Sequence, residues 1–141
     1  MSLPTFGIAH HGEERSYGLT EQESALVGTV IETIRASDLI HDPIDITSKS
    51  SNYKSIVIRG KVCDFDLMRF KFTDKTAWVA VPLSNADNKE YRDDPRFAAQ
   101  KNKNQFVWKA KIGFPEDVSQ FIPFAIRAFL EYAEKVEGFT S

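Results

Sequence analysis

The chain has 141 residues, of which 42% are hydrophobic and 27% charged, with 18 basic and 20 acidic side chains and a formal net charge of −2. This composition is typical of one folded domain and excludes collagen, coiled coils and long disorder. Its apolar runs are too short to cross a bilayer, no signal peptide opens it, and the single Cys63 has no partner thiol. We therefore expect a cytoplasmic protein that binds no membrane.

The first predicted element is a helix that follows a flexible arm. Residues 1–19 contain three glycines and show no sustained hydrophobic period, which is typical of an arm or loop. Thr20 and Glu23 have the spacing of a capping box, in which each side chain satisfies a free amide of the first turn. Apolar residues then recur at helical spacing, so we expect a helix over residues 21–36.

The middle of the chain predicts four β-strands, at residues 55–59, 65–72, 76–81 and 106–112. The first three are separated by turns too short for a crossover, so they should pair antiparallel. Residues 37–52 are interpreted as a connector, and part of this segment, around Ile44 and Ile46, could form an edge strand. Residues 84–104 form a polar excursion that is either a binding loop or a variable surface loop.

A second helical pattern covers residues 118–133 and should end near Gly138. Pro115 suits a first turn, whereas Pro123 predicts a kink or a short helix followed by a longer one. The fold expected is a two-layer α+β domain over residues 20–138, in the order helix, four antiparallel strands, helix, with both helices on one face. Its core would hold Trp78, Trp108, Phe70, Phe72, Phe121, Phe124 and Phe129.

Charge is distributed unevenly along the chain. Residues 1–53 carry −5, residues 54–111 carry +6 and residues 112–141 carry −3. Strand alternation should place cations on the sheet face opposite the helices, where they could bind phosphates; these are Arg59, Arg69, Lys71, Lys109 and Lys111. Phe65 is the only aromatic residue whose position in the alternation clearly places it on the same face as these cations, where it could stack on a base. The alternative interpretation is an ordinary sheet face exposed to solvent. The excursion offers a second set of residues that could bind an anion: Tyr91, Arg92, Arg96, Lys101 and Lys103.

Patterns for catalysis or metal binding are weak. His10 and His11, with Glu13, Glu14 and His41, lack a fixed ligand geometry, and Asp64, Asp66 and Asp74 are better explained by turns and solvent-facing positions. Cys63 has no neighbouring histidine to generate a thiolate, and no glycine-rich phosphate loop is present. We expect a non-enzymatic binding module for an anionic partner such as nucleic acid, with no cofactor or metal. The alternatives are a module that dimerises through a sheet edge or its acidic helical surface, and an enzyme with a site under the excursion.

One resemblance rests on the later part of the chain. Tyr91-Arg-Asp-Asp-Pro-Arg96, Phe106-Val-Trp-Lys-Ala-Lys-Ile112, Pro115-Glu-Asp-Val118 and the final helix resemble a bacterial domain of unknown function. That domain is found alone or at the C-terminus of predicted nuclease-like, restriction-associated proteins. The resemblance spans about residues 21–136. It implies a fold and no catalytic residues, and any nuclease activity would belong to a neighbouring domain.

Overall fold

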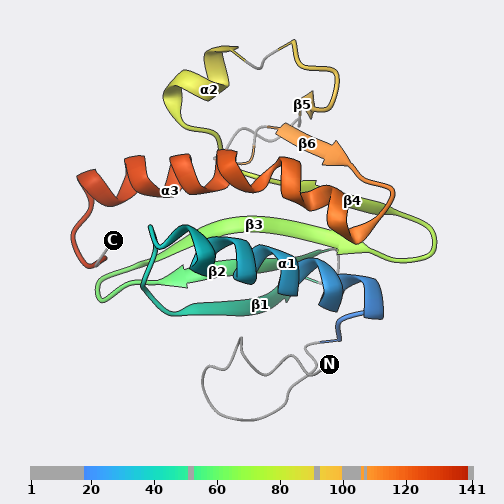
Figure 1. Ribbon diagram of the computed structural model, residues 1–141, viewed down its shortest axis with the longest axis horizontal. Helices are drawn as coiled ribbons and strands as arrows, with labels where there is room; N and C mark the ends of the chain where they lie inside the picture. Colours follow the sequence, from blue (N-terminus) through green and yellow to red (C-terminus); the bar gives the residue numbers. More distant parts are fainter. Residues whose placement is uncertain (1–17, 51–52, 91–92, 100–105, 107, 140–141) are drawn as a thin grey trace.

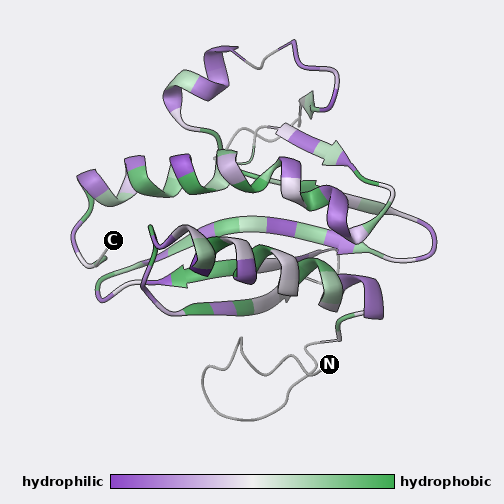
Figure 2. Ribbon diagram, viewed as in Figure 1, coloured by the Kyte–Doolittle hydropathy of each residue, from purple (hydrophilic) through white to green (hydrophobic). Residues whose placement is uncertain are grey.

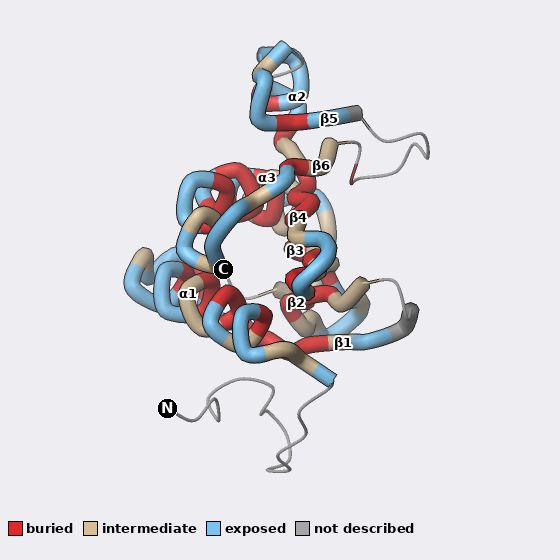
Figure 3. Tube along the Cα trace, turned by 90° about the vertical axis from the view of Figure 1, so that its right-hand side faces the viewer, coloured by how far each residue is buried: buried red, intermediate tan, exposed pale blue. Residues whose placement is uncertain are grey.

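A computed structural model describes residues 18–50, 53–90, 93–99, 106 and 108–139 (Figure 1). One antiparallel sheet of six strands runs in the order β1-β2-β3-β4-β6-β5. Helices α1 and α3 lie side by side on one of its faces, which makes two layers (Figure 3). The strands are β1 (Ile44–Ser50), β2 (Tyr53–Arg59), β3 (Asp64–Phe72), β4 (Ala77–Ala80), β5 (Ala98–Ala99) and β6 (Trp108–Lys111).

The antiparallel α+β architecture is confirmed, and the expected number of strands is wrong. Four strands match the predicted segments, and the structure adds one strand at each edge of the sheet. Strand β1 includes Ile44 to Ile46, the segment for which an edge strand was one of two interpretations. The two residues of β5 lie within the excursion of residues 84–104. Two residues are too few for a hydrophobic pattern to predict a strand, so only pairing with β6 defines β5.

Helix α1 (Glu21–Ser37) begins at the predicted capping box. Glu23 N–H donates to the Thr20 hydroxyl at 3.0 Å, and Thr20 N–H donates to the Glu23 carboxylate at 3.0 Å. The other oxygen of Glu23 accepts from the Phe72 N–H at the end of β3, at 2.8 Å. The same two residues therefore start the helix and attach it to the sheet, since the Thr20 hydroxyl also donates to the Phe72 carbonyl at 2.7 Å.

Strand β3 contains a β-bulge that changes which residues face the helices. Ile56 of β2 pairs with Met68, but the next residue, Val57, pairs with Asp66, so Leu67 is an extra residue. Leu67 and Met68 are both fully buried. As a result, Phe65 faces the helices before the bulge, and Phe70 and Phe72 face them after it.

The C-terminal segment divides at Pro123, as predicted. The 3-10 helix η2 (Pro115–Gln120) is followed by α3 (Ile122–Lys135), with Pro123 in the first turn of α3, where its missing N–H has no intrahelical partner to lose. The helix ends at Lys135, slightly before the expected Gly138. Pro123 therefore begins a helix and does not interrupt one.

The core lies between the sheet and the apolar sides of α1 and α3, whose outer sides are polar (Figure 2). The predicted core residues Phe70, Phe72, Phe121, Phe124 and Phe129 belong to it, and Trp108 packs against it while donating from Nε1 to Asn88 at 2.8 Å. Trp78 was wrongly assigned to the core. It alternates with buried Val79 on β4 and points to the opposite sheet face.

The excursion is held against α3 in the part of it that the structure describes. It forms α2 (Asn85–Glu90), which lies at the β5 edge of the sheet (Figure 1). Arg127 of α3 donates to the buried Asp87 at 2.9 Å, and the Asn85 N–H donates to Glu131 at 3.2 Å. Leu19, just before α1, packs against the core, while most of the predicted arm, residues 1–17, lies outside the described residues. Among described helices, none is long and apolar enough to cross a membrane.

Candidate anion-binding face

The strand register defines one continuous surface, the outer face, on the side of the sheet away from α1 and α3. Its residues stand in cross-strand rows, so that Thr47, Ser55, Arg69, Ala80 and Lys109 follow one another across five strands. A neighbouring row holds Lys71, Trp78 and Lys111, and extending the register of β2 puts Tyr53 opposite Lys71. All five cations proposed from the sequence for the sheet surface lie on the outer face: Arg59, Arg69, Lys71, Lys109 and Lys111.

Arg59 is held by two carboxylates. Its guanidinium donates to Asp64 at 2.6 Å and to Asp45 at 2.8 Å. Partial burial alone would lower the pKa of Arg59, but the hydrogen bonds and charges of these two aspartates outweigh it and raise the pKa above its usual value. The charge of Arg59 is thus already compensated within the sheet.

Arg69 is fixed by three neighbours at the centre of the outer face. It donates from Nε to Asp66 at 3.2 Å, and its guanidinium carbon lies 4.8 Å from the ring centroid of Tyr53 and 4.3 Å from that of Phe106. The Phe106 side chain is buried although it is outside the main core, which fits a ring that covers Arg69. A guanidinium held by a carboxylate and aromatic rings is a structural group, because moving away would break all of these interactions.

The three lysines differ from the arginines. Lys71, Lys109 and Lys111 form no ion pair with any residue in the described parts of the chain. Lys109 places its ammonium 4.3 Å from the ring centroid of Trp78. Lys71 and Lys111 stand on either side of Trp78 in the register. We call these three lysines the lysine strip; it spans β3, β4 and β6.

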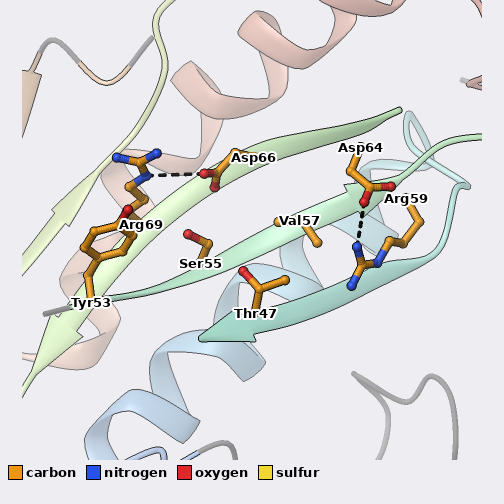
Figure 4. Close-up of a pocket in the computed structure, with 8 residues that line it drawn as sticks. All are labelled: Thr47, Tyr53, Ser55, Val57, Arg59, Asp64, Asp66 and Arg69. Atoms are coloured by element: carbon orange, nitrogen blue, oxygen red, sulfur yellow. Dashed lines mark hydrogen bonds and ion pairs between the residues drawn. The ribbon is translucent and has the colours of Figure 1, made fainter. Parts of the chain in front are cut away.

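A hollow lies beside the lysine strip, over β1, β2 and β3 (Figure 4). Its volume is about 170 Å³, and two carboxylates and two guanidiniums contribute its charges. The dashed lines in Figure 4 join these charges in pairs, Arg69 with Asp66 and Arg59 with Asp64. The hollow is lined by Thr47, Tyr53, Ser55, Val57, Arg59, Asp64, Asp66 and Arg69. Because its charges compensate one another, the excess positive charge of the outer face resides in the lysine strip.

The candidates from the excursion do not join this surface as far as the structure describes them. Arg96 makes hydrogen bonds of 2.7 to 3.2 Å to Asp94 and one of 3.1 Å to Gln120 of η2. The Arg96 side-chain hydrogen bond keeps the pKa of Asp94 below its usual value. Arg96 therefore fixes the excursion to the helical layer. Tyr91, Arg92, Lys101 and Lys103 lie outside the described residues.

Groups with catalytic or metal-binding potential are dispersed. His41 lies 3.7 Å from Asp38 at the end of α1, and no cluster of three potential ligands occurs within the described ranges. Asp64 forms an ion pair with Arg59, and Asp66 forms one with Arg69. Asp74 is exposed in the β3–β4 turn. The Cys63 sulfur lies 3.3 Å from the Tyr132 hydroxyl, a contact that, with burial, raises the pKa of Tyr132. His10, His11, Glu13 and Glu14 lie in the segment that is not described.

Tyr53 and Trp78 were missed as residues of the outer face, and Phe65 was assigned to it wrongly. Phe65 is buried against Phe129, with ring centroids 5.4 Å apart, because the bulge shifts its parity relative to Arg69. Tyr53 and Trp78 occupy the outer face instead, half-buried, with ring centroids 6.4 Å apart and an angle of 58° between the rings. Alternation with Val79 could have revealed Trp78, whereas Tyr53 precedes the predicted strand.

Comparison of the chain with protein-family models, with curated proteins and with solved structures finds no match. The resemblance to the bacterial domain of unknown function stays a prediction. The function is therefore argued from the outer face.

Proposed function

We propose that this protein is a non-enzymatic binding module whose outer face takes an anionic partner, with nucleic acid as the leading candidate. The observation that carries the proposal is the lysine strip: Lys71, Lys109 and Lys111 lie together on one face, without carboxylate partners among the described residues. The lone Cys63 suits a reducing compartment, which is consistent with a cytoplasmic location.

The difference between the lysines and the arginines supports an electrostatic mechanism. An ammonium without a fixed partner can approach a phosphate and release its condensed counterions, which provides the driving force for binding. Arg59 and Arg69 would first have to leave Asp45, Asp64 and Asp66, so we assign them to the support of the sheet. The residues proposed to contact the anion are therefore the three lysines of the strip, and not all five cations proposed from the sequence.

The proposal is tested by reversing charge within the strip. Lys109→Glu combined with Lys111→Glu should weaken binding to labelled oligonucleotides and reduce the salt dependence. For single strands, the slope of log K against log salt should become shallower by about 0.7 for each phosphate that the variant no longer neutralises. Fluorescence anisotropy over a series of salt concentrations measures both quantities.

A matched control is Lys61→Glu combined with Lys135→Glu. It produces the same change in net charge at two exposed positions, one in the β2–β3 turn and one in the last turn of α3, the helix on the opposite side of the sheet from the strip. The control should keep most of the affinity, because salt screens the effect of charges that lie far from the bound strand. An equal decrease in affinity in both double variants, or an unchanged affinity in the strip variant, would contradict the proposed surface.

A further inference from the structure

The aromatic residues of the outer face stand among the lysines. Trp78 pairs across the strands with Lys71 on one side and Lys111 on the other, and the Tyr53 ring lies 6.4 Å from it. Both rings are half-buried and belong to the face that the helices do not cover. Because these large rings lie outside the core and in a row of cations, the surface can stack on planar groups as well as attract anions.

The geometry points to single-stranded nucleic acid as the partner, with bases stacked on Trp78 and Tyr53 and phosphates held by the lysine strip. This inference rests on the proposed function and specifies its ligand. An aromatic ring accepts the π face of any base, and such stacking on an electropositive surface is how proteins bind single strands without reading their sequence. In a duplex the bases are already stacked on one another and cannot lie flat on a sheet.

The surroundings of the two rings favour this arrangement. Arg69 packs on Tyr53 at 4.8 Å and is itself held by Asp66, so the Tyr53 ring is positioned before a ligand arrives. Lys109 packs on Trp78 at 4.3 Å, and no carboxylate of the described residues pairs with it. When a base stacks on Trp78, the Lys109 ammonium can therefore leave the ring and bind a phosphate of the same nucleic acid strand. The neutral hollow adds no phosphate contact, because its guanidiniums are paired.

The test compares three probes: a single-stranded oligodeoxythymidine, a duplex of matched length, and inorganic polyphosphate, which has charge but no bases. The unmodified protein should bind the single strand more tightly than the duplex. Trp78→Leu should weaken single-strand binding by about tenfold, which is the scale of one stacking contact. The same variant should bind polyphosphate within about twofold of the unmodified protein, since its lysines are retained.

Controls separate stacking from folding. Phe114→Leu removes a 65% exposed ring that lies after β6, and it should leave all three affinities unchanged. Tyr53→Leu provides a second variant should Trp78→Leu fold poorly. Tryptophan fluorescence gives an independent signal, because quenching by the single strand should disappear in Trp78→Leu, where only Trp108, packed against the core, remains.

The outcomes distinguish the two claims. Equal binding of single strand and duplex, or a Trp78→Leu protein that binds the single strand normally, overturns the stacking inference and leaves charge-driven binding intact. Failure to bind any of the three probes at low salt overturns both. A selective decrease of single-strand binding in Trp78→Leu and Tyr53→Leu supports both.

Discussion

Glu23 shows at the scale of one residue how the two layers are joined. Its side chain is 1% exposed, yet it accepts hydrogen bonds from the N–H groups of Thr20 and Phe72, and the Lys54 ammonium lies 3.6 Å away. A buried carboxylate is tolerated here because donors and a cation surround it. The capping box and the attachment of α1 to β3 therefore depend on the same group.

Glu23→Ala is expected to lower the free energy of unfolding by about 2 to 3 kcal/mol, because it leaves the Phe72 N–H buried without its acceptor and removes the acceptor of the Thr20 N–H in the capping box. Glu21→Ala, at an exposed position of the same first turn, is the control and should change stability by less than about 0.5 kcal/mol. Urea unfolding followed by circular dichroism measures both. Similar values for the two variants would mean that Glu23 contributes no more than a surface residue.

At the scale of an element, the bulge in β3 determines the two faces of the sheet. Without the extra Leu67, the residues from Asp64 to Asp66 would exchange faces, which would turn Phe65 outward and the two aspartates toward the core. Deleting Leu67 should therefore abolish cooperative unfolding. Leu67→Ala leaves a cavity, costs about 2 to 5 kcal/mol and keeps the fold. The two variants are compared by thermal unfolding and near-ultraviolet circular dichroism, and a deletion no worse than the alanine substitution would show that β3 tolerates a regular register.

At the scale of the whole molecule, both edges of the sheet are poorly suited to pairing with a second chain. Strand β5 has two residues, and at the other edge the Asp45 carboxylate accepts from the Ile46 N–H at 2.8 Å, which occupies a donor in edge strand β1. A very short edge strand, and an edge strand with a donor that is already bonded, offer fewer groups for a second chain to pair with. We therefore expect a monomer of 16.0 kDa by light scattering over a wide range of protein concentration. A mass that doubles with concentration would instead favour the dimerisation module.

Elements whose signals are local could be predicted from the sequence. The capping box at Thr20 and Glu23, the proline at the start of α3, and the apolar periods of both helices predict their structures because each depends on neighbours within a few residues. The short turns likewise determined that consecutive strands pair antiparallel. The alternation of Lys71, Lys109 and Lys111 with apolar residues predicted that they share one face.

Which groups meet across strands depends on how distant segments pair in the folded chain. Arg59 reaches Asp45, and Arg69 reaches Tyr53 and Phe106, through register between segments far apart in the chain. The bulge at Leu67 changes the parity of β3 by one residue and leaves no periodic signal, so Phe65 and the aromatic side of the outer face could not be assigned in advance. Local patterns determine what each segment can form, whereas pairing of distant strands decides which cations are neutralised and which remain available to bind.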